Sequence, residues 1–359
     1  MEFAENWEKT KARFDAFWQS EVLDRCMIAA FAPRDGAKQG DFPFPDTWNE
    51  QASWWLDGER VFKRQYHGMQ NTYYGGDAFP QFGLDCGAAG HAGFFRGARA
   101  TFQQGTIWYH PSIEDIERDE LIFDRSNSFY SQIIELAKYL CAESKGRAFV
   151  SNADTCGNLD ALAHLRGNEA VLMDLLTDPD WVDASLATIQ QAWETFHEEL
   201  ITILQAHNDG GASVGWLNTW GRGRHGQMQA DISVMMSEAM FDRFILPELV
   251  PQTRWFDHSL YHLDGLEQLR FLDTLLALPD LDAIQWTCVE GQPPPVAFLP
   301  ELRRMQQAGK KLVFRVYNLR DLEDMLTGLS SKGLMMGIHC ETEDEARQAV
   351  RMAERLTHD

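Results

Sequence analysis

The chain has 359 residues, 44% of them hydrophobic, and its formal net charge is −22. This charge argues against nucleic acid as a partner, because the chain would repel a phosphate backbone. It also disfavours a polyanionic substrate unless a local arginine cluster reverses the field.

The cysteine pattern and the N-terminus bear on where the protein works. Six cysteines are scattered along the chain without a CxxC pair, which is typical of a reduced, intracellular protein. The N-terminal segment is acidic and does not resemble a secretory signal. No apolar run approaches the roughly 18–20 residues that span a bilayer. We therefore expect a soluble cytoplasmic protein without a membrane partner.

The first 110 residues combine helical patterns with irregular sequence. Apolar residues spaced by three, four and seven positions predict helices over 1–25 and 50–69. A short apolar run over 26–32 predicts a strand between them. The Gly-rich stretch 73–100 shows no regular period, and long irregular insertions in a compact domain are usually functional. We expect this stretch to form a long active-site loop region.

From residue 112 onward, helical and strand patterns alternate. Strands are expected over 148–152, 212–217, 259–264, 283–286, 311–316 and 334–338, with helices over 126–144, 158–176, 179–207, 237–257, 266–278, 297–308, 319–328 and 344–356. This alternation predicts βαβ units and a parallel sheet. Seven to eight strands favour a closed (β/α)8 TIM barrel, of class α/β, over an open sheet. We predict one barrel domain over 1–359, in which residues 1–110 carry N-terminal helices and the long loop region.

A His and an Asp two positions apart end the run over 259–265. Residues i and i+2 of a strand share one side, so His262 and Asp264 would project together, and Gly265 lets the chain turn sharply. They could bind a metal or move a proton; alternatively, a buried His is hydrogen-bonded to a helix N-cap Asp. In a barrel the strand ends form the active face.

Cys340 follows the last predicted strand and could join His262 and Asp264. Nitrogen, oxygen and thiolate are all acceptable zinc ligands, and three protein ligands leave a catalytic position open. Cys288 or His339 could replace Cys340 in this set. The alternative is that Cys340 is a small buried hydrophobic residue.

Several carboxylates near strand ends are candidates for general acid and base catalysis, provided that burial separates their pKa values. They are Asp85, Asp154, Asp160, Asp231 and Glu290. A solvated position or a helix N-cap is the alternative for each.

Aromatic and basic residues near strand ends are candidates for substrate binding. Tyr74 and Trp220 stand beside glycines and polar residues, which suits a flat organic ligand or a sugar ring. Basic side chains could bind a carboxylate or phosphate, the alternative being solvated surface arginines. The remaining candidates are Arg222, Arg224, His225, Arg315 and Tyr317. The loop over 221–226 lacks the context of a dinucleotide fingerprint.

Four segments between residues 110 and 357 resemble the uroporphyrinogen decarboxylase superfamily. Residues 236–247, MSEAMFDRFILP, resemble its SPEMFxEFVLP helix start, and 262–265, HLDG, fall at its H-x-x-G strand end. Residues 282–286, DAIQW, are similar to its D-x-h-x-h-D/E strand, and 168–179 to its E-x-x-h-x-D-h-h-x-D-P helix, h being hydrophobic. The resemblance implies a (β/α)8 barrel with its site at the C-terminal mouth.

The superfamily has two well-known chemistries. Its decarboxylases act without a cofactor on a tetrapyrrole with many carboxylates; Asp85 would correspond to their catalytic Asp, but the R-Q-A-G-R motif is absent. Its corrinoid-linked methyltransferases bind zinc through His-x-Cys and a distant Cys. Here His262-x-Asp264 stands in place of His-x-Cys, and Cys340 falls close to the last ligand. The harder oxygen ligand would make the metal more Lewis-acidic.

The resemblance therefore implies a zinc-dependent enzyme with His262, Asp264 and Cys340 as ligands. The expected reaction is methyl transfer to or from a small substrate, with a corrinoid protein as partner. One alternative is a zinc-dependent, glycosidase-like hydrolase acting on a sugar or other neutral polar ligand, with Asp85, Asp154, Asp231 or Glu290 in catalysis. A second alternative is a metal-free decarboxylase.

Overall fold

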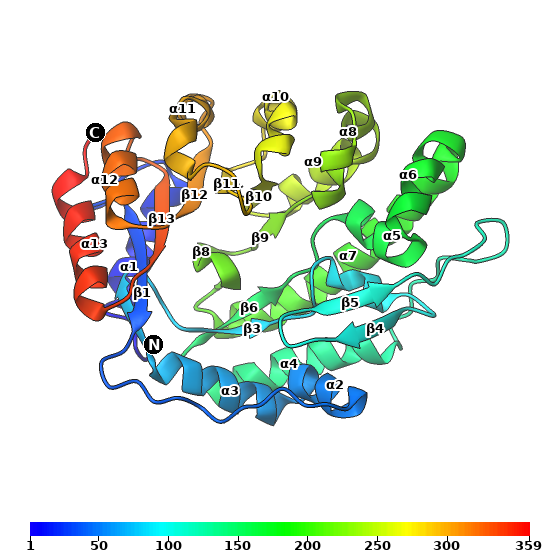
Figure 1. Ribbon diagram of the computed structural model, residues 1–359, viewed down its shortest axis with the longest axis horizontal. Helices are drawn as coiled ribbons and strands as arrows, with labels where there is room; N and C mark the ends of the chain where they lie inside the picture. Colours follow the sequence, from blue (N-terminus) through cyan, green and yellow to red (C-terminus); the bar gives the residue numbers. More distant parts are fainter.

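A computed structural model describes all 359 residues, and its strands surround a centre with helices outside them (Figure 1). The main sheet has seven strands in the order β2-β1-β13-β12-β11-β10-β9. All neighbours pair in parallel except β2, which is antiparallel to β1. The strands are β1 Met27–Pro33, β2 Thr72–Gly76, β9 His225–Met228, β10 His258–Asp264, β11 Ala283–Thr287, β12 Lys311–Val316 and β13 Leu334–His339.

Three further strands complete the barrel on its other side. β3 (Gln81–Leu84) pairs in parallel with β6 (Phe149–Ala153). β7 (Gly211–Val214) contacts β6 on one side and β9 on the other. The predicted α/β class and TIM barrel are therefore confirmed. β8 (Thr219–Arg222) forms a hairpin with β7, and β4 (Arg99–Phe102) forms a second hairpin with β5 (Ile107–His110).

Helices follow the strands and cover the outside of the barrel (Figure 1). The α-helices are α1 Trp7–Trp18, α2 Trp48–Leu56, α3 Gly58–Gln70, α4 Ser128–Ser144, α5 Asn158–Arg166, α6 Asn168–Thr177, α7 Pro179–His207, α8 Glu238–Phe244, α9 Leu246–Trp255, α10 Leu272–Ala277, α11 Leu299–Gln307, α12 Leu319–Gly328 and α13 Glu343–Leu356. Short 3-10 helices are η1 Gly90–Phe94, η2 Gly215–Leu217, η3 Asp231–Met235, η4 Leu266–Phe271 and η5 Pro295–Phe298.

Several predicted helices are divided in the structure; the one expected over 237–257, for example, forms α8 and α9, which meet at Ile245. The helix expected over 50–69 breaks at Asp57, whose side chain caps α3 by accepting a hydrogen bond from the Arg60 N–H at 2.9 Å. The helix expected over 158–176 breaks at Gly167, which has a φ of +94°. That conformation is accessible to glycine and ends the helical turn. Short regular elements interrupt the irregular stretch expected over 73–100, since β2, β3, η1 and β4 lie within or across it.

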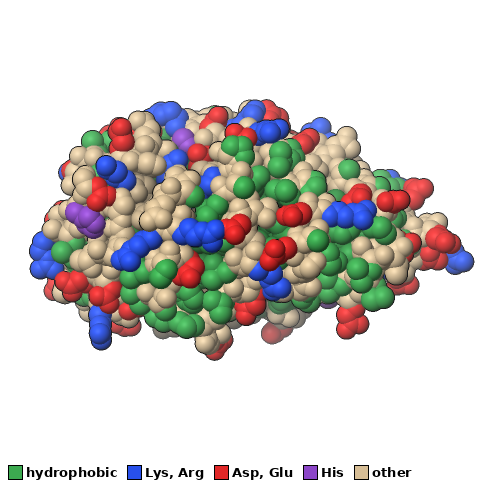
Figure 2. Space-filling view, turned by 90° about the horizontal axis from the view of Figure 1, so that it is seen from above, with side chains coloured by type: hydrophobic (Ala, Val, Ile, Leu, Met, Phe, Trp, Pro, Cys, Tyr) green, Lys and Arg blue, Asp and Glu red, His purple; other side chains and the backbone are tan.

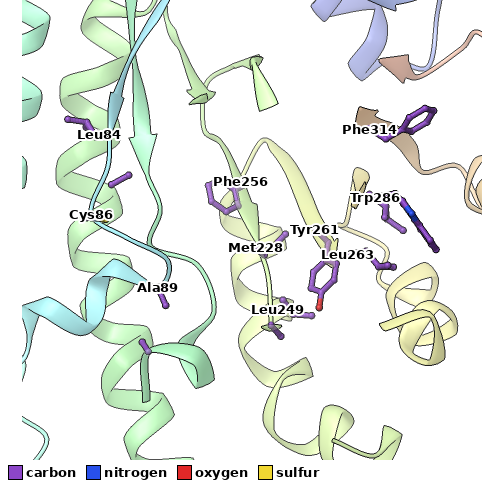
Figure 3. Packing of buried hydrophobic residues seen from close by; sticks show 14 of the residues in the cluster. Leu84, Cys86, Ala89, Met228, Leu249, Phe256, Tyr261, Leu263, Trp286 and Phe314 are labelled. Atoms are coloured by element: carbon purple, nitrogen blue, oxygen red, sulfur yellow. The ribbon is translucent and has the colours of Figure 1, made fainter. Parts of the chain in front are cut away.

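Alternating residues of the barrel strands enter two separate cores. On β10, Tyr261 and Leu263 point outward to the main core, where Tyr261 lies beside Leu249 of α9 (Figure 3). Leu260, from the other side of the strand, belongs to a second core inside the barrel. This alternation is what a strand geometry with period two produces.

Helix α1 fills the amino-terminal end of the barrel. Its Phe14, Phe17 and Trp18 belong to the same core as Leu260 and Ala283, which lie near the starts of β10 and β11. The Trp18 indole N–H donates a hydrogen bond to the Trp220 carbonyl at 2.9 Å. The apolar plug leaves the carboxyl ends of the strands as the open, polar end.

None of the helices combines the length and the apolar composition needed to cross a membrane. On the face drawn in Figure 2, acidic and basic side chains are interspersed and the basic ones do not merge into one patch.

Removing the apolar plug should destabilise the whole barrel. Phe14→Ala deletes a side chain with no exposed surface, and we expect the free energy of unfolding to fall by about 3–5 kcal/mol. Denaturant unfolding followed by far-UV circular dichroism measures this. Glu8→Ala, at an exposed position of the same helix, should change it by less than about 1 kcal/mol; equal effects of the two substitutions would contradict the plug.

Candidate metal centre and active site

Three possible metal ligands converge at the open end of the barrel. His262 and Asp264 lie on the inner side of β10, and Asp231 begins η3 after the neighbouring strand β9. One ligand atom from each of the three lies within 4.8 Å of the others. The His262 Nε2 and Asp264 Oδ1 atoms are 3.9 Å apart. The sequence placed Asp231 among the acid and base candidates, and the structure groups it with His262 and Asp264.

Gln285 fixes the tautomer of His262. The β10–β11 register places Gln285 beside His262. The Gln285 Nε2 donates to the Trp286 carbonyl at 2.7 Å and to the Thr287 hydroxyl at 2.8 Å. Its Oε1 therefore accepts from the His262 Nδ1–H. The Nε2 lone pair of His262 is left facing the cluster, as in a metal-binding histidine, and burial lowers the pKa of His262, which favours the neutral ring.

A row of amides along β9 and beyond orients Asp231. The Trp216 indole N–H donates to Gln227 Oε1 at 2.6 Å, and Gln227 Nε2 donates to Gln229 Oε1 at 3.3 Å. Gln229 Nε2 in turn donates to Asp231 Oδ2 at 3.1 Å. The other carboxylate oxygen, Asp231 Oδ1, is buried and has no hydrogen-bond partner. Because a buried, unpaired carboxylate oxygen is costly, a bound cation would suit this position.

Gln268 ties together the two segments that carry the ligands. Its Oε1 accepts a hydrogen bond from the Asp264 N–H at 3.2 Å. Its Nε2 donates to the carbonyl of Ala230, next to Asp231, at 3.0 Å. Gly265, directly after Asp264, has a φ of +81°, which turns the chain away from the barrel. The spacing of the three ligands is thus fixed by local contacts.

The carboxylates in and beside the cluster do not all ionise readily at neutral pH. Burial, with Asp264 and Asp154 contributing, raises the pKa of Asp231 to about 7. Asp160 accepts hydrogen bonds from the N–H groups of Asp231 and Ile232 at 2.9 and 2.7 Å. Burial, followed by the charge of Asp231, raises the pKa of Asp160 to about 7 as well. A cation held here would favour the ionised forms.

Two cavities adjoin Trp216. The first cavity, about 580 Å³, is lined by β1, β2, β12 and β13 and includes Tyr74 and Arg315. The second, about 370 Å³, is lined by β3, β6, β7 and β9 and includes Asp85 and Asp154. The Trp216 ring lies edge-on to the His262 ring, with centroids 5.1 Å apart. Trp216 therefore connects both cavities with His262, although none of Asp231, His262 and Asp264 lines either cavity.

Asp154 is suited to proton transfer near neutral pH. Burial, followed by the charge of Asp85, raises the pKa of Asp154 to about 7, and its Oδ1 has no partner. Asp85 Oδ1 accepts from the Gly87 N–H at 3.0 Å, and restricted access of water raises the pKa of Asp85 too. Groups whose pKa lies near the working pH are the effective acids and bases.

Cys340 lies outside the group formed by Asp231, His262 and Asp264. It lines the first cavity, and its N–H donates to the Phe31 carbonyl at 2.7 Å. Burial raises the pKa of the Cys340 thiol to about 11, which disfavours the thiolate that metals bind. Of the three predicted ligands, the structure thus brings His262 and Asp264 together and groups Asp231, rather than Cys340, with them.

The loop over 220–226 lies at the opposite end of the barrel from the cluster. Strand β8 runs antiparallel to β7 and carries the chain back, so His225 pairs with His258 at the start of β10. Arg222 pairs with Asp15 of α1 at 3.0 Å, and Arg224 with Glu198 at 3.1 Å. The substrate-binding roles predicted for this loop assumed that it followed a strand upward, and the hairpin reverses that direction.

Two aromatic rings of that segment have structural contacts. Trp220 is fully buried in the inner core, and its indole N–H donates to the Asn208 carbonyl at 3.0 Å. His225 is fully buried; its Nδ1–H donates to the His258 carbonyl and its Nε2 accepts from the Thr219 hydroxyl, both at 2.8 Å. Burial lowers the pKa of His225 to about 3. Neither side chain lines the two cavities.

The remaining predicted residues lie around the open end. Tyr74 and Arg315 line the first cavity. Tyr317 and Glu290 are exposed in the loops after β12 and β11, respectively. Sequence reasoning missed the roles of Trp216, Gln285, Gln227 of β9 and Gln229 directly after it. The i, i+2, i+4 spacing of Gln227, Gln229 and Asp231 was the available signal, because it is a strand pattern of polar residues on one side.

The sequence matches no protein-family model, and no curated protein matches it. Among solved structures, a methyltransferase from Methanosarcina mazei is similar, with a TM-score of 0.56 and 12% sequence identity over 96% of this chain and 98% of that chain. A B12-independent methionine synthase from Shewanella sp. W3-18-1, in complex with selenomethionine, aligns over 93% of this chain and 96% of that chain, with a TM-score of 0.45 and 10% identity. The first likeness confirms, over nearly the whole chain, the fold that the superfamily resemblance implied.

Because the pKa of Asp154 is raised, replacing it by an uncharged residue should stabilise the protein, and more so at higher pH. In the metal-free protein, ionisation of Asp154 opposes folding. The stability that the protonated side chain provides is therefore lost as the pH rises from about 4 through about 7. The gain in the free energy of unfolding from Asp154→Asn, relative to the wild type, should therefore be larger at pH 8 than at pH 5 by about 1 kcal/mol or more. Urea unfolding at both pH values measures this. The exposed Asp41→Asn is the control, and a pH-independent effect of Asp154→Asn would contradict the prediction.

Proposed function

We propose that this protein is a zinc-dependent enzyme that binds the metal through Asp231, His262 and Asp264 and catalyses methyl transfer to or from a small substrate. The observation that carries the proposal is the convergence of three ligand atoms within 4.8 Å, with the Nε2 of His262 left free by Gln285. The unpartnered, buried Oδ1 of Asp231 supports it.

The donor set suits a catalytic zinc. One imidazole nitrogen and two carboxylate oxygens are accepted zinc ligands, and three protein ligands leave a position for a substrate atom. A zinc ion bound there would supply Lewis acidity, which lowers the pKa of a coordinated thiol, hydroxyl or water and makes it nucleophilic. Because two of the ligands are hard oxygens, the donor set also accommodates other divalent metals.

The residues around the cluster have distinct parts in this proposal. Gln285 holds the His262 ring in the ligating tautomer and orientation. Asp154 takes up the proton released by the nucleophile at its unpartnered Oδ1. Trp216 stands against His262 and limits the access of water from the side of the first cavity.

The rim of the barrel supports a protein partner as the methyl donor. Large apolar side chains are exposed after the carboxyl ends of five strands: Trp216, Met235, Leu266, Val289 and Tyr317. Exposed apolar groups concentrated around a site are typical of an interaction surface. A corrinoid protein docked on this rim would present its methyl group to the cluster. The Methanosarcina protein that shares the fold is a methyltransferase, which agrees with this reaction class.

Asp154 also favours a second candidate function, a zinc-dependent hydrolase acting on a neutral polar ligand such as a sugar. Its pKa of about 7 lets it serve as base and then as acid. The second cavity, which Asp154 lines with Asp85, has several hydrogen-bonding groups. In this reaction a water would take the place of the methyl acceptor.

Metal binding tests the proposed ligands one by one. The chelated protein should take up one zinc per chain, and Asp231→Ala, His262→Ala and Asp264→Ala should each weaken binding by 100-fold or more, on the order expected for loss of a ligand. Competition titration with a chromogenic chelator measures the affinity. Cys340→Ser is the matched control and should keep wild-type affinity. Loss of zinc in Cys340→Ser, with retention in Asp231→Ala, would contradict the set and restore the one predicted with Cys340.

The role of Gln285 has its own test. Gln285→Leu keeps the volume but removes the acceptor for the His262 Nδ1–H, so zinc affinity should fall by about 10- to 100-fold. Gln285→Glu restores an acceptor and should recover part of it. Affinity is measured by the same competition. Unchanged affinity in Gln285→Leu would show that the tautomer is fixed in another way.

Methyl transfer and hydrolysis are separated by product analysis. The zinc-loaded protein should demethylate a methylcob(III)alamin probe in the presence of small thiols, a reaction followed by the absorbance change to cob(I)alamin under anaerobic conditions. His262→Ala should lose this activity. Release of nitrophenol from chromogenic glycosides without demethylation would contradict methyl transfer and favour the second candidate.

A further inference from the structure

The first cavity differs in charge from the rest of the molecule. The chain has 54 acidic residues against 32 lysines and arginines, yet none of the 19 residues that line this cavity is Asp or Glu. Its only lysine or arginine is Arg315, and its only histidine is His339. A cavity free of carboxylates, in so acidic a protein, is locally favourable for an anion.

Arg315 has no acidic partner within the protein. Its guanidinium donates to the Trp216 carbonyl and lies over the Trp216 ring, 5.6 Å from the centroid. No carboxylate contributes to its pKa, which desolvation lowers. By contrast, Arg222, Arg224 and Arg254 each pair with an Asp or Glu. The remaining donors of Arg315 are therefore available to a ligand.

The strand register leaves room beside this arginine. Gly337 of β13 pairs with Arg315 of β12, and a Cβ added at Gly337 would lie 3.7 Å from the Arg315 Cγ. His339, two residues further along β13, stacks on Phe31 with ring centroids 5.1 Å apart. Burial and the neighbouring Arg315 both lower the pKa of His339, so its neutral ring can take part in a hydrogen bond beside the guanidinium.

Trp216 connects this region with the metal-ligand cluster. The guanidinium of Arg315 lies over its ring, and the ring lies edge-on to His262. Arg315 and His262 are thus separated by about one indole. A small molecule held at one end by Arg315 could reach the cluster with its other end around Trp216.

We propose that the first cavity binds the anionic end of an organic-acid substrate, with Arg315 holding a single carboxylate or sulfonate group. The walls formed by Phe31, Tyr74 and Phe314 contact the apolar body of the molecule. One arginine matches one negative charge, not a polyphosphate. The anion site is inferred from the cavity alone. The identification of the bound molecule as the substrate rests on the proposed function.

The test compares an acid with its uncharged analogue. Isothermal titration calorimetry of the metal-free protein would use 3-phenylpropanoate and 3-phenylpropanamide as probes. The acid should bind at least tenfold more tightly than the amide. Arg315→Gln should weaken binding of the acid by about 10- to 100-fold, the range for hydrogen bonds between charged groups, and should leave the amide unaffected. Arg315→Lys should be intermediate, because lysine keeps the charge without the planar fork.

Two controls separate this proposal from the metal centre. Arg254→Gln, which alters an exposed ion pair, should leave acid binding unchanged. His262→Ala should abolish zinc binding but keep the preference for the acid, and Arg315→Gln should keep zinc binding. Equal affinity for acid and amide, no binding of the acid, or unchanged affinity in Arg315→Gln would overturn the anion site. A wild-type protein that binds no zinc but still prefers the acid would overturn only the proposed function.

Discussion

The register between β10 and its two neighbours is the constraint on which the candidate site depends. Parallel pairing with β11 places Gln285 beside His262, and pairing with β9 brings the segment that begins at Asp231 next to the end of β10. A shift by one residue would turn His262 and Asp264 into the outer core and Tyr261 and Leu263 into the barrel. The apolar contacts of Tyr261 and Leu263 with the helices oppose such a shift. The site geometry is thus held by packing on the other side of the same strand.

The two ends of the barrel have opposite character. At one end, α1 fills the barrel with aromatic side chains. At the other, burial and, after it, the charge of neighbouring carboxylates raise the pKa values of Asp154, Asp160 and Asp231 to about 7. Such an arrangement destabilises the metal-free fold at neutral pH, because charged groups are removed from water without a counterion. A divalent cation bound there, as we propose, would offset this cost.

The barrel could be predicted because its signals are local. Strand β12 and helix α12 have the predicted bounds, since each is a regular apolar pattern between clear helix or strand ends. The hairpin of β7 and β8 could not be predicted, because four-residue strands carry too little periodicity. Missing that reversal placed Arg222, Arg224 and His225 at the wrong end of the barrel. Local sequence gives an element, but the direction of the next element depends on long-range packing.

Only the part of the candidate site that depends on local spacing could be predicted from the sequence. His262 and Asp264 share one side of one strand, so their proximity follows from the spacing alone. Asp231 lies 31 residues earlier and meets them only through strand pairing. Cys340 was favoured by family resemblance, which carries over residue types without the geometry of this chain. Gln285 had no sequence signal of its own, because its function arises from the residue it pairs with.

The central claim is that the metal ligands are nitrogen and oxygen atoms, and X-ray absorption spectroscopy of the zinc-loaded protein tests it directly. Coordination by Asp231, His262 and Asp264 predicts a first shell of nitrogen and oxygen scatterers at about 2.0–2.2 Å, with the multiple-scattering features of one imidazole. A sulfur scatterer at about 2.3 Å would place Cys340 or another cysteine on the metal. That result would contradict the ligand set and the account of the cluster built on it.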